Sequence, residues 1–269
     1  MWLHLLKIDL KKMTNYRTFW VICGLYFITL ALTTASGMEF LKLLARSIEG
    51  FGAELNINRI PLYHFPDVWL NLIWFSGWLK ILPAIMVVVS ITNEFSYRTL
   101  RQNVIDGLSR GEFLLSKILT NVVLSAASMV LVFVIGLVTG LIYSPDVSIE
   151  QMFTDMEFLP AYFLEVFSFL SFATMLAILV QRSGLTIVIV MFAQLVELFI
   201  TEKFFRDPLP EVIPFFPMKS IWYLIEFPLP RYWFQEIKDY ITLISVITII
   251  FWTAVYNYVS YVKLKRMDI

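Results

Sequence analysis

Long apolar runs alternate with short polar segments along most of this chain. Six runs approach the roughly 20 apolar residues that a helix needs to cross a bilayer core, and they lie at 19–36, 68–92, 118–143, 159–180, 185–201 and 240–262. Only Gln181 to Gly184 separate the fourth run from the fifth, which predicts an antiparallel helical hairpin. We therefore predict an all-α integral membrane protein in which residues 1–269 form one transmembrane domain of six helices.

The most polar long segment, Asn93 to Lys117, lies between the second and third runs. On a helical wheel its apolar and polar positions separate onto two faces, with Tyr97, Leu100, Val104 and Leu108 on one and Arg98, Arg101, Gln102 and Asp106 on the other. The pattern predicts a short amphipathic helix that lies against the membrane.

The residues that follow this short helix are typical of a helix end and a new start. Gly107 is a natural C-terminal stop, and Ser109 with Glu112 has the spacing of a capping box. We expect a sharp elbow here, after which a helix runs from Gly111 directly into the third span.

Two further segments outside the spans have recognisable patterns. The N-terminus interleaves Lys7, Lys11 and Lys12 with apolar residues, which predicts a basic amphipathic helix suited to an anionic lipid surface. A proline-rich segment from Glu202 to Lys238 separates the fifth and sixth spans, and its apolar stretches are too short to cross the membrane.

The distribution of cations predicts the orientation. Twelve of the 21 Lys and Arg residues would gather on one side: Lys7, Lys11, Lys12, Arg17, Arg98, Arg101, Arg110, Lys117, Arg182, Lys263, Lys265 and Arg266. By the positive-inside rule this side is the cytoplasm. We expect both termini and the Asn93–Lys117 segment to be cytoplasmic, in a multi-pass protein of the cell's inner membrane.

Composition supports the membrane class and narrows the chemistry. Hydrophobic residues make up 59% of the chain and charged residues 16%, against roughly 25% charged in soluble domains. The formal net charge is zero, which gives no reason to expect a nucleic-acid partner. His4 and His64 are predicted on opposite membrane sides, so we expect no histidine-based metal site. No phosphate-binding loop and no Gly-x-Ser-x-Gly or His-Glu-x-x-His motif occurs, so we predict no catalytic residues in this chain.

Three charged residues fall within predicted spans: Lys80, Glu165 and Glu197. Each costs about 2.5 to 3.5 kcal/mol at such depth, so each is expected to face the protein interior and find a partner. One interpretation is an ion pair of Lys80 with Glu165 or Glu197. The other is that these groups line a polar part of a substrate route. In the third span, Gly136 and Gly140 have the Gly-x-x-x-Gly spacing that permits close helix packing within the chain or between copies.

The polar segment carries a family resemblance. Its series Asn93-Glu94, Arg98-Thr99, Ser109-Arg110 and Lys117 resembles the cytoplasmic loop of bacterial type-2 ATP-binding-cassette (ABC) transporter permeases, and the six-span layout is similar to theirs. The resemblance implies a coupling helix between spans 2 and 3, an N-terminal elbow helix, and short outer helices between spans 5 and 6. It also implies a second permease copy or relative, surrounding lipids, and a cytosolic ABC ATPase subunit that binds ATP and Mg, with no cofactor in this chain.

Residue roles follow from the same resemblance. Arg98, Arg101, Gln102 and Asp106 would contact the ATPase, within a loop that also includes Thr99 and Arg110. Glu94 would tie the end of the second span to the loop, and Ser109 with Glu112 would hold the elbow.

Three functional hypotheses follow from these patterns. The first is the membrane-spanning subunit of an ATP-driven ABC transporter, expected to be an exporter of a small molecule, peptide or lipid-like substrate. The second is a scaffold or receptor subunit that holds a cytosolic partner without transport. The third is an ion-coupled secondary carrier that uses Lys80 with Glu165 or Glu197. Such carriers are typically built from repeats with helices broken at matching places, and the sequence shows no repeat and no mate for Pro83.

Overall fold

The computed structural model describes residues 2–47, 62–222, 224–228 and 240–267, and these are mostly helical, with no strand among them. Residues 223 and 229–238 of the predicted outer segment lie outside the described residues. The helices are α1 (Trp2–Thr14), α2 (Arg17–Ser47), α3 (Val68–Gly77), η2 (Trp78–Lys80), α4 (Ile81–Ser96), α5 (Thr99–Ile105), α6 (Arg110–Tyr143), α7 (Ile149–Phe153), α8 (Phe158–Val180), α9 (Ser183–Ile200), η3 (Thr201–Phe205), η4 (Pro210–Phe215), α10 (Pro217–Trp222) and α11 (Leu243–Arg266).

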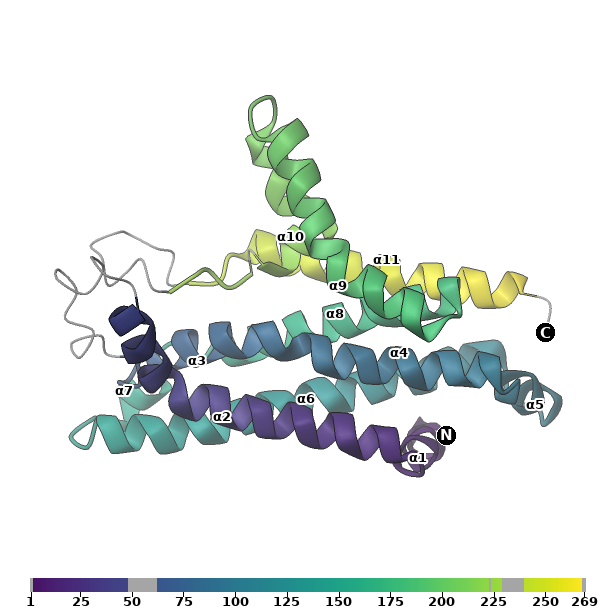
Figure 1. Ribbon diagram of the computed structural model, residues 1–269, viewed down its shortest axis with the longest axis horizontal. Coiled ribbons are helices and arrows are strands. Elements are labelled where there is room, and N and C mark those ends of the chain that lie inside the picture. Colours follow the sequence, from purple (N-terminus) through teal and green to yellow (C-terminus); the bar gives the residue numbers. More distant parts are fainter. Residues whose placement is uncertain (1, 48–61, 223, 229–239, 268–269) are drawn as a thin grey trace.

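Six helical segments of the described chain are long and apolar enough to cross a membrane, as the apolar runs predict. They are Arg17–Thr34, Val68–Ser96, Arg110–Tyr143, Ile149–Val180, Ser183–Phe205 and Leu243–Arg266. Helices α4, α6, α8 and α11 run along one axis of the molecule, whereas α9 turns away from it (Figure 1).

The second span contains a local change of winding. The 3₁₀ turn Trp78–Lys80 joins α3 to α4, just ahead of Pro83 in the first turn of α4. Proline has no amide hydrogen, and its ring crowds the carbonyl of the residue four positions earlier, here Leu79. The 3₁₀ turn changes the backbone winding at this place and relieves that contact, so the span continues past Pro83 as a helix.

Helix α8 lies at the centre of the bundle and packs against α4, α6 and α11. Its inner residues are fully buried, among them Leu170, Ala173 and Ala177. The buried face of α6 is rich in small and polar residues, including Ser125, Ser128, Gly136 and Gly140. Small residues on this face let neighbouring helices and rings approach closely.

Two of the three glycines of α6, Gly136 and Gly140, face aromatic rings of the same chain. A Cβ at Gly136 would lie 2.6 Å from a ring carbon of Trp69, and a Cβ at Gly140 would overlap the ring of Phe65. The Gly-x-x-x-Gly spacing therefore serves packing within the chain.

Apolar residues cover the outer faces of the peripheral helices. Exposed side chains include Trp20, Leu25 and Ile28 on α2, Leu185, Phe192 and Phe199 on α9, and Ile247 and Phe251 on α11. This apolar exterior is the arrangement that a hydrocarbon environment requires.

Both chain ends lie at the same end of the bundle as α5, whereas α7 lies at the opposite end (Figure 1). We refer to the end that holds α1, α5 and the last turn of α11 as the terminal end. The amphipathic segments predicted at the N-terminus and before Gly107 are both helical, as α1 and α5.

Candidate functional site

Helix α5 forms a short step between the second and third spans. Arg98 precedes it in the left-handed conformation, with φ 56°, and turns the chain sharply after α4. Gly107 follows it with φ 99°, a conformation that favours glycine. Leu100 is buried and Val104 and Leu108 are half-buried, while Arg98, Arg101, Gln102 and Asp106 are exposed, as predicted for those residues. Tyr97, which was predicted on the apolar face, is 68% exposed, because it lies at the end of α4 ahead of the turn at Arg98 and not within α5.

The start of α6 is fixed by the predicted capping box. The amide of Glu112 donates to Ser109 Oγ at 3.2 Å, and the amide of Ser109 donates to Glu112 Oε2 at 2.8 Å. The two bonds satisfy donors that a helix start leaves without intrahelical partners.

Arg110 ties this elbow to the C-terminal helix. Its Nη1 donates to the carbonyl oxygens of Leu264 at 3.0 Å and Lys265 at 2.6 Å, in the last turn of α11. The guanidinium thus donates to carbonyls in the last turn of α11, where Leu264 also accepts from the amide of Met267 at 3.4 Å, and it places positive charge at the negative end of the helix dipole. The Ser109–Glu112 elbow and the end of α11 are therefore held together.

A buried ion cluster lies directly beneath α5. Lys117 of α6 is 3% exposed, and its Nζ donates to Asp9 Oδ1 of α1 and to Glu94 Oε1 of α4, each at 2.5 Å. Thr120 donates its hydroxyl to the second oxygen of Asp9 at 2.6 Å. A buried lysine between two carboxylates thus joins three helices that are distant in sequence.

Two more side chains complete the cluster through Glu94. Asn103 of α5 donates to Glu94 Oε2 at 3.3 Å, and Lys12 of α1 lies 3.5 Å from the same oxygen. The two cations, Lys12 and Lys117, balance the two anions, Asp9 and Glu94. We call these residues, with Asn103 and Thr120, the Lys117 cluster. A balanced set of charges limits the cost of burying each member.

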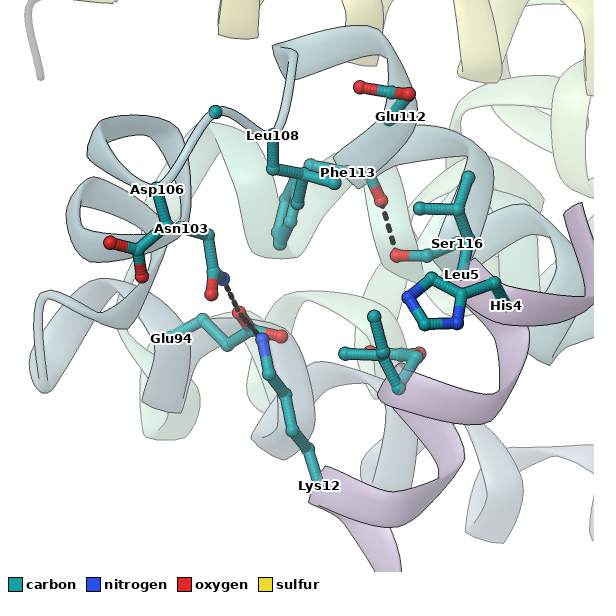
Figure 2. A pocket seen from close by; sticks show the side chains of 13 residues that line it. His4, Leu5, Lys12, Glu94, Asn103, Asp106, Leu108, Glu112, Phe113 and Ser116 are labelled. Atoms are coloured by element: carbon teal, nitrogen blue, oxygen red, sulfur yellow. Dashed lines mark hydrogen bonds and ion pairs between the residues drawn. The ribbon is translucent and has the colours of Figure 1, made fainter. Parts of the chain in front are cut away.

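A cavity of about 380 Å³ opens beside the cluster, between α1, α5 and the start of α6. Figure 2 shows Lys12 and Asn103 reaching Glu94 on one side of it, with Asp106 and Glu112 around its margin. Asp9 and Glu94 also line the cavity, so the ion cluster forms part of its wall.

A second buried ion pair lies inside the bundle, away from the terminal end. Lys80 of η2 donates to Glu165 of α8, and the two side chains are 4% and 6% exposed. The Lys80 ammonium also lies 5.6 Å from the ring centre of Phe169. Of the two partners predicted for Lys80, the structure selects Glu165.

Glu197 serves a different element. Its carboxylate accepts from the amides of Met218 at 2.9 Å and Lys219 at 2.6 Å, at the start of α10. It therefore caps α10, which lies within the proline-rich segment, and anchors that segment to α9.

The structure groups the predicted site residues into three places. Glu94, Thr99 and the capping pair organise the loop, the exposed residues Arg98, Arg101, Gln102 and Asp106 form its outer face, and Arg110 reaches α11. Lys80 and Glu165 form a separate pair, and Glu197 caps α10.

Sequence reasoning missed Asp9, Lys12, Asn103 and Thr120 as members of the site. Asp9 carried a usable signal, because it shares the spacing of Leu5 and Met13 along one face of α1 and is a charge on that apolar stripe. Asn103 carried none, since an amide on a short polar helix is unremarkable.

No group of three or more His, Cys, Asp and Glu side chains that could hold a metal ion occurs in the ranges that the structure describes.

Comparison with protein families matches residues 60–269 to the family described as "Protein of unknown function (DUF2705)", and the chain belongs to this family. The matched region contains α5, the capping box, Glu94 of α4, which pairs with Lys117, and Glu165 of α8, which pairs with Lys80. Helices α1 and α2 precede this region. No curated protein matches the chain.

Proposed function

We propose that this protein is the membrane-spanning subunit of an ATP-driven transporter of the type-2 ABC class, with α5 as the helix that contacts a separate ATPase chain. The observation that carries the proposal is the construction of α5. Its outer face presents Arg98, Arg101, Gln102 and Asp106 to solvent. At its base, Glu94 is held by Asn103 and Lys117. A helix with an exposed polar face and a firmly bonded buried side is suited to be displaced as a unit by a bound partner.

The path of such a push follows from the contacts. Helix α5 lies between the ends of the second and third spans, and Arg110 connects the same elbow to α11. Movement of α5 would therefore act on α4, α6 and α11 together. In this proposal the partner binds and hydrolyses ATP with Mg, and the present chain converts the partner's movement into a rearrangement of its spans.

Further elements agree with this function. Helix α1 provides the amphipathic N-terminal helix that the resemblance implies, and η3, η4 and α10 provide short helices between the fifth and sixth spans. We propose that the terminal end faces the cytoplasm, in agreement with the cations gathered on that side. We also propose that the chain pairs with a second permease copy or relative, and that it exports a small molecule, peptide or lipid-like substrate.

Affinity purification in mild detergent tests the proposal. The natural sequence should bring down a nucleotide-hydrolysing chain, identified by mass spectrometry and by an ATPase assay. Changing Arg98, Arg101 and Gln102 together to Ala should abolish this copurification while the permease remains folded.

A matched control removes three exposed residues at the same end but away from α5. Changing Arg182, Lys263 and Lys265 together to Ala should leave the copurification intact, because none of them belongs to the outer face of α5. Loss of the ATPase in both variants would assign its binding to general surface charge. Absence of any ATPase with the intact natural protein would overturn the proposal.

A further inference from the structure

The outer face of α5 and the N-terminal helix α1 do not adjoin in sequence, yet a chain of polar contacts connects them. Asn103 of α5 donates to Glu94, Glu94 accepts from Lys117, and Lys117 donates to Asp9 of α1. Each of the last three residues is less than one-tenth exposed.

We propose that Asn103, Glu94, Lys117 and Asp9 form a polar link that transmits displacement of α5 to α1, with Asn103 and Asp9 as its two positioning ends. For its role in transport this inference rests on the function proposed above. The mechanical link itself is a property of this chain alone and can be tested without a partner.

Burial gives the link its stiffness. When a buried ion loses its partner, the cost is the uncompensated charge, which is far larger than the value of an exposed pair. If α5 draws Glu94 away from Lys117, the lysine keeps Asp9 but has lost one of two carboxylates, and Glu94 must find new donors. The arrangement of lowest energy keeps the members together, so α1 follows α5.

Asn103 is the point at which this link can be perturbed selectively. It is the α5 side chain that contacts the cluster carboxylate, and it does so as a donor. An aspartate at this position would replace the donor with a negative charge beside Glu94. The change should weaken the hold of the cluster on α1 through like-charge repulsion.

The test uses a reporter thiol on the buried side of α1. Met13 is 2% exposed, and Cys23 is the one natural cysteine, so Met13→Cys in a Cys23→Ala background gives a single buried thiol. Its rate of reaction with a maleimide in detergent-purified protein measures how often α1 separates from the rest of the bundle and exposes the thiol. We expect Asn103→Asp to accelerate labelling about tenfold, which corresponds to about 1.4 kcal/mol, and Asn103→Ala to accelerate it less.

Gln102→Glu is the matched control. It makes the same amide-to-carboxylate change one residue earlier, and it also faces a carboxylate, since Gln102 donates to Asp106 at 3.1 Å. That contact is exposed and does not reach the cluster, so labelling should stay within about twofold of the parent rate. Equal acceleration by both changes, or no acceleration by Asn103→Asp, would overturn the link.

A second experiment tests whether the link between α5 and α1 contributes to transport. With the copurified ATPase, Asn103→Asp should keep the two chains together but reduce the effect of the permease on ATP hydrolysis, because the outer face of α5 is unchanged. Retention of the full effect would overturn the role in coupling. If no ATPase copurifies with the natural protein, the proposed function fails, while the labelling result still decides whether α5 and α1 are linked.

Discussion

Removing one member of the Lys80–Glu165 pair should destabilise the bundle severely. Both side chains are nearly inaccessible, at 4% and 6%, so neither can recover its hydration when the other is lost. We consider Lys80→Met and Glu165→Gln, which remove one charge each with little change of volume, and the double variant that removes both.

The magnitude follows from the burial of the pair. A single change that leaves an unpaired buried charge costs about 3 to 5 kcal/mol, whereas replacing both members with neutral groups is close to neutral in many proteins. We therefore expect each single variant to lose about 3 kcal/mol or more. The double variant should lose less than either single one, which gives a large coupling energy between the two positions.

Equilibrium unfolding in detergent, followed by tryptophan fluorescence, measures the three variants and the parent. A Lys80→Met protein as stable as the parent would refute the reasoning, because the pair would then contribute nothing to the fold. If that variant assembled normally but had altered transport, the alternative interpretation would gain, in which Lys80 and Glu165 line a substrate route. Failure of the single variants to accumulate, with recovery in the double variant, would support the structural role.

Three further outcomes are expected. Ser109→Ala should remove about 1 kcal/mol of local helix stability, seen as faster amide exchange in the first turn of α6, and should lower coupling; unchanged ATP-driven transport would count against the assignment of α5. Gly136→Ala places a Cβ 2.6 Å from Trp69 and should destabilise the protein by about 1 to 3 kcal/mol in thermal unfolding, whereas Gly24→Ala, with nothing within 4 Å of its Cβ, should be tolerated. Glu197→Gln should weaken the cap of α10 by about 1 kcal/mol, so amide exchange at the start of α10 should accelerate; unaltered exchange there would contradict the capping role.

The six long helices could be predicted from sequence because the requirement is local. A span needs a sufficient length of apolar residues, and that length is visible in one dimension. The capping box at Ser109 and the stop at Gly107 were predictable for the same reason, since their partners lie within three residues or in the backbone itself.

The Lys80 pair could be predicted only in part. The cost of an isolated charge in a span required a partner for Lys80, but the choice between Glu165 and Glu197 depends on how the helices are arranged. Sequence could not show that Glu197 would meet the amides at the start of α10, because that contact requires the chain after α9 to fold back.

The Lys117 cluster was harder to predict from sequence than the Lys80 pair. Lys117 and Glu94 belong to the quoted loop motif, yet Asp9 joins them from more than 80 residues away. Its position on the apolar face of α1 required a buried partner, but only the packing of α1 against α6 identifies that partner as Lys117. Long-range ion pairs are fixed by tertiary structure, whereas spans and caps are fixed by neighbours.

The two buried ion clusters differ in a way that suits them to different tasks. Lys80 and Glu165 are almost inaccessible, so any separation leaves a charge without water or partner. The Lys117 cluster adjoins the 380 Å³ cavity, and its fourth ion, Lys12, has a side chain that is 36% exposed. Its three innermost members, Asp9, Glu94 and Lys117, are each less than one-tenth exposed, so the cost of separating them keeps them together when α5 moves. The first pair is therefore suited to fix the spans, and the second cluster to move with α5.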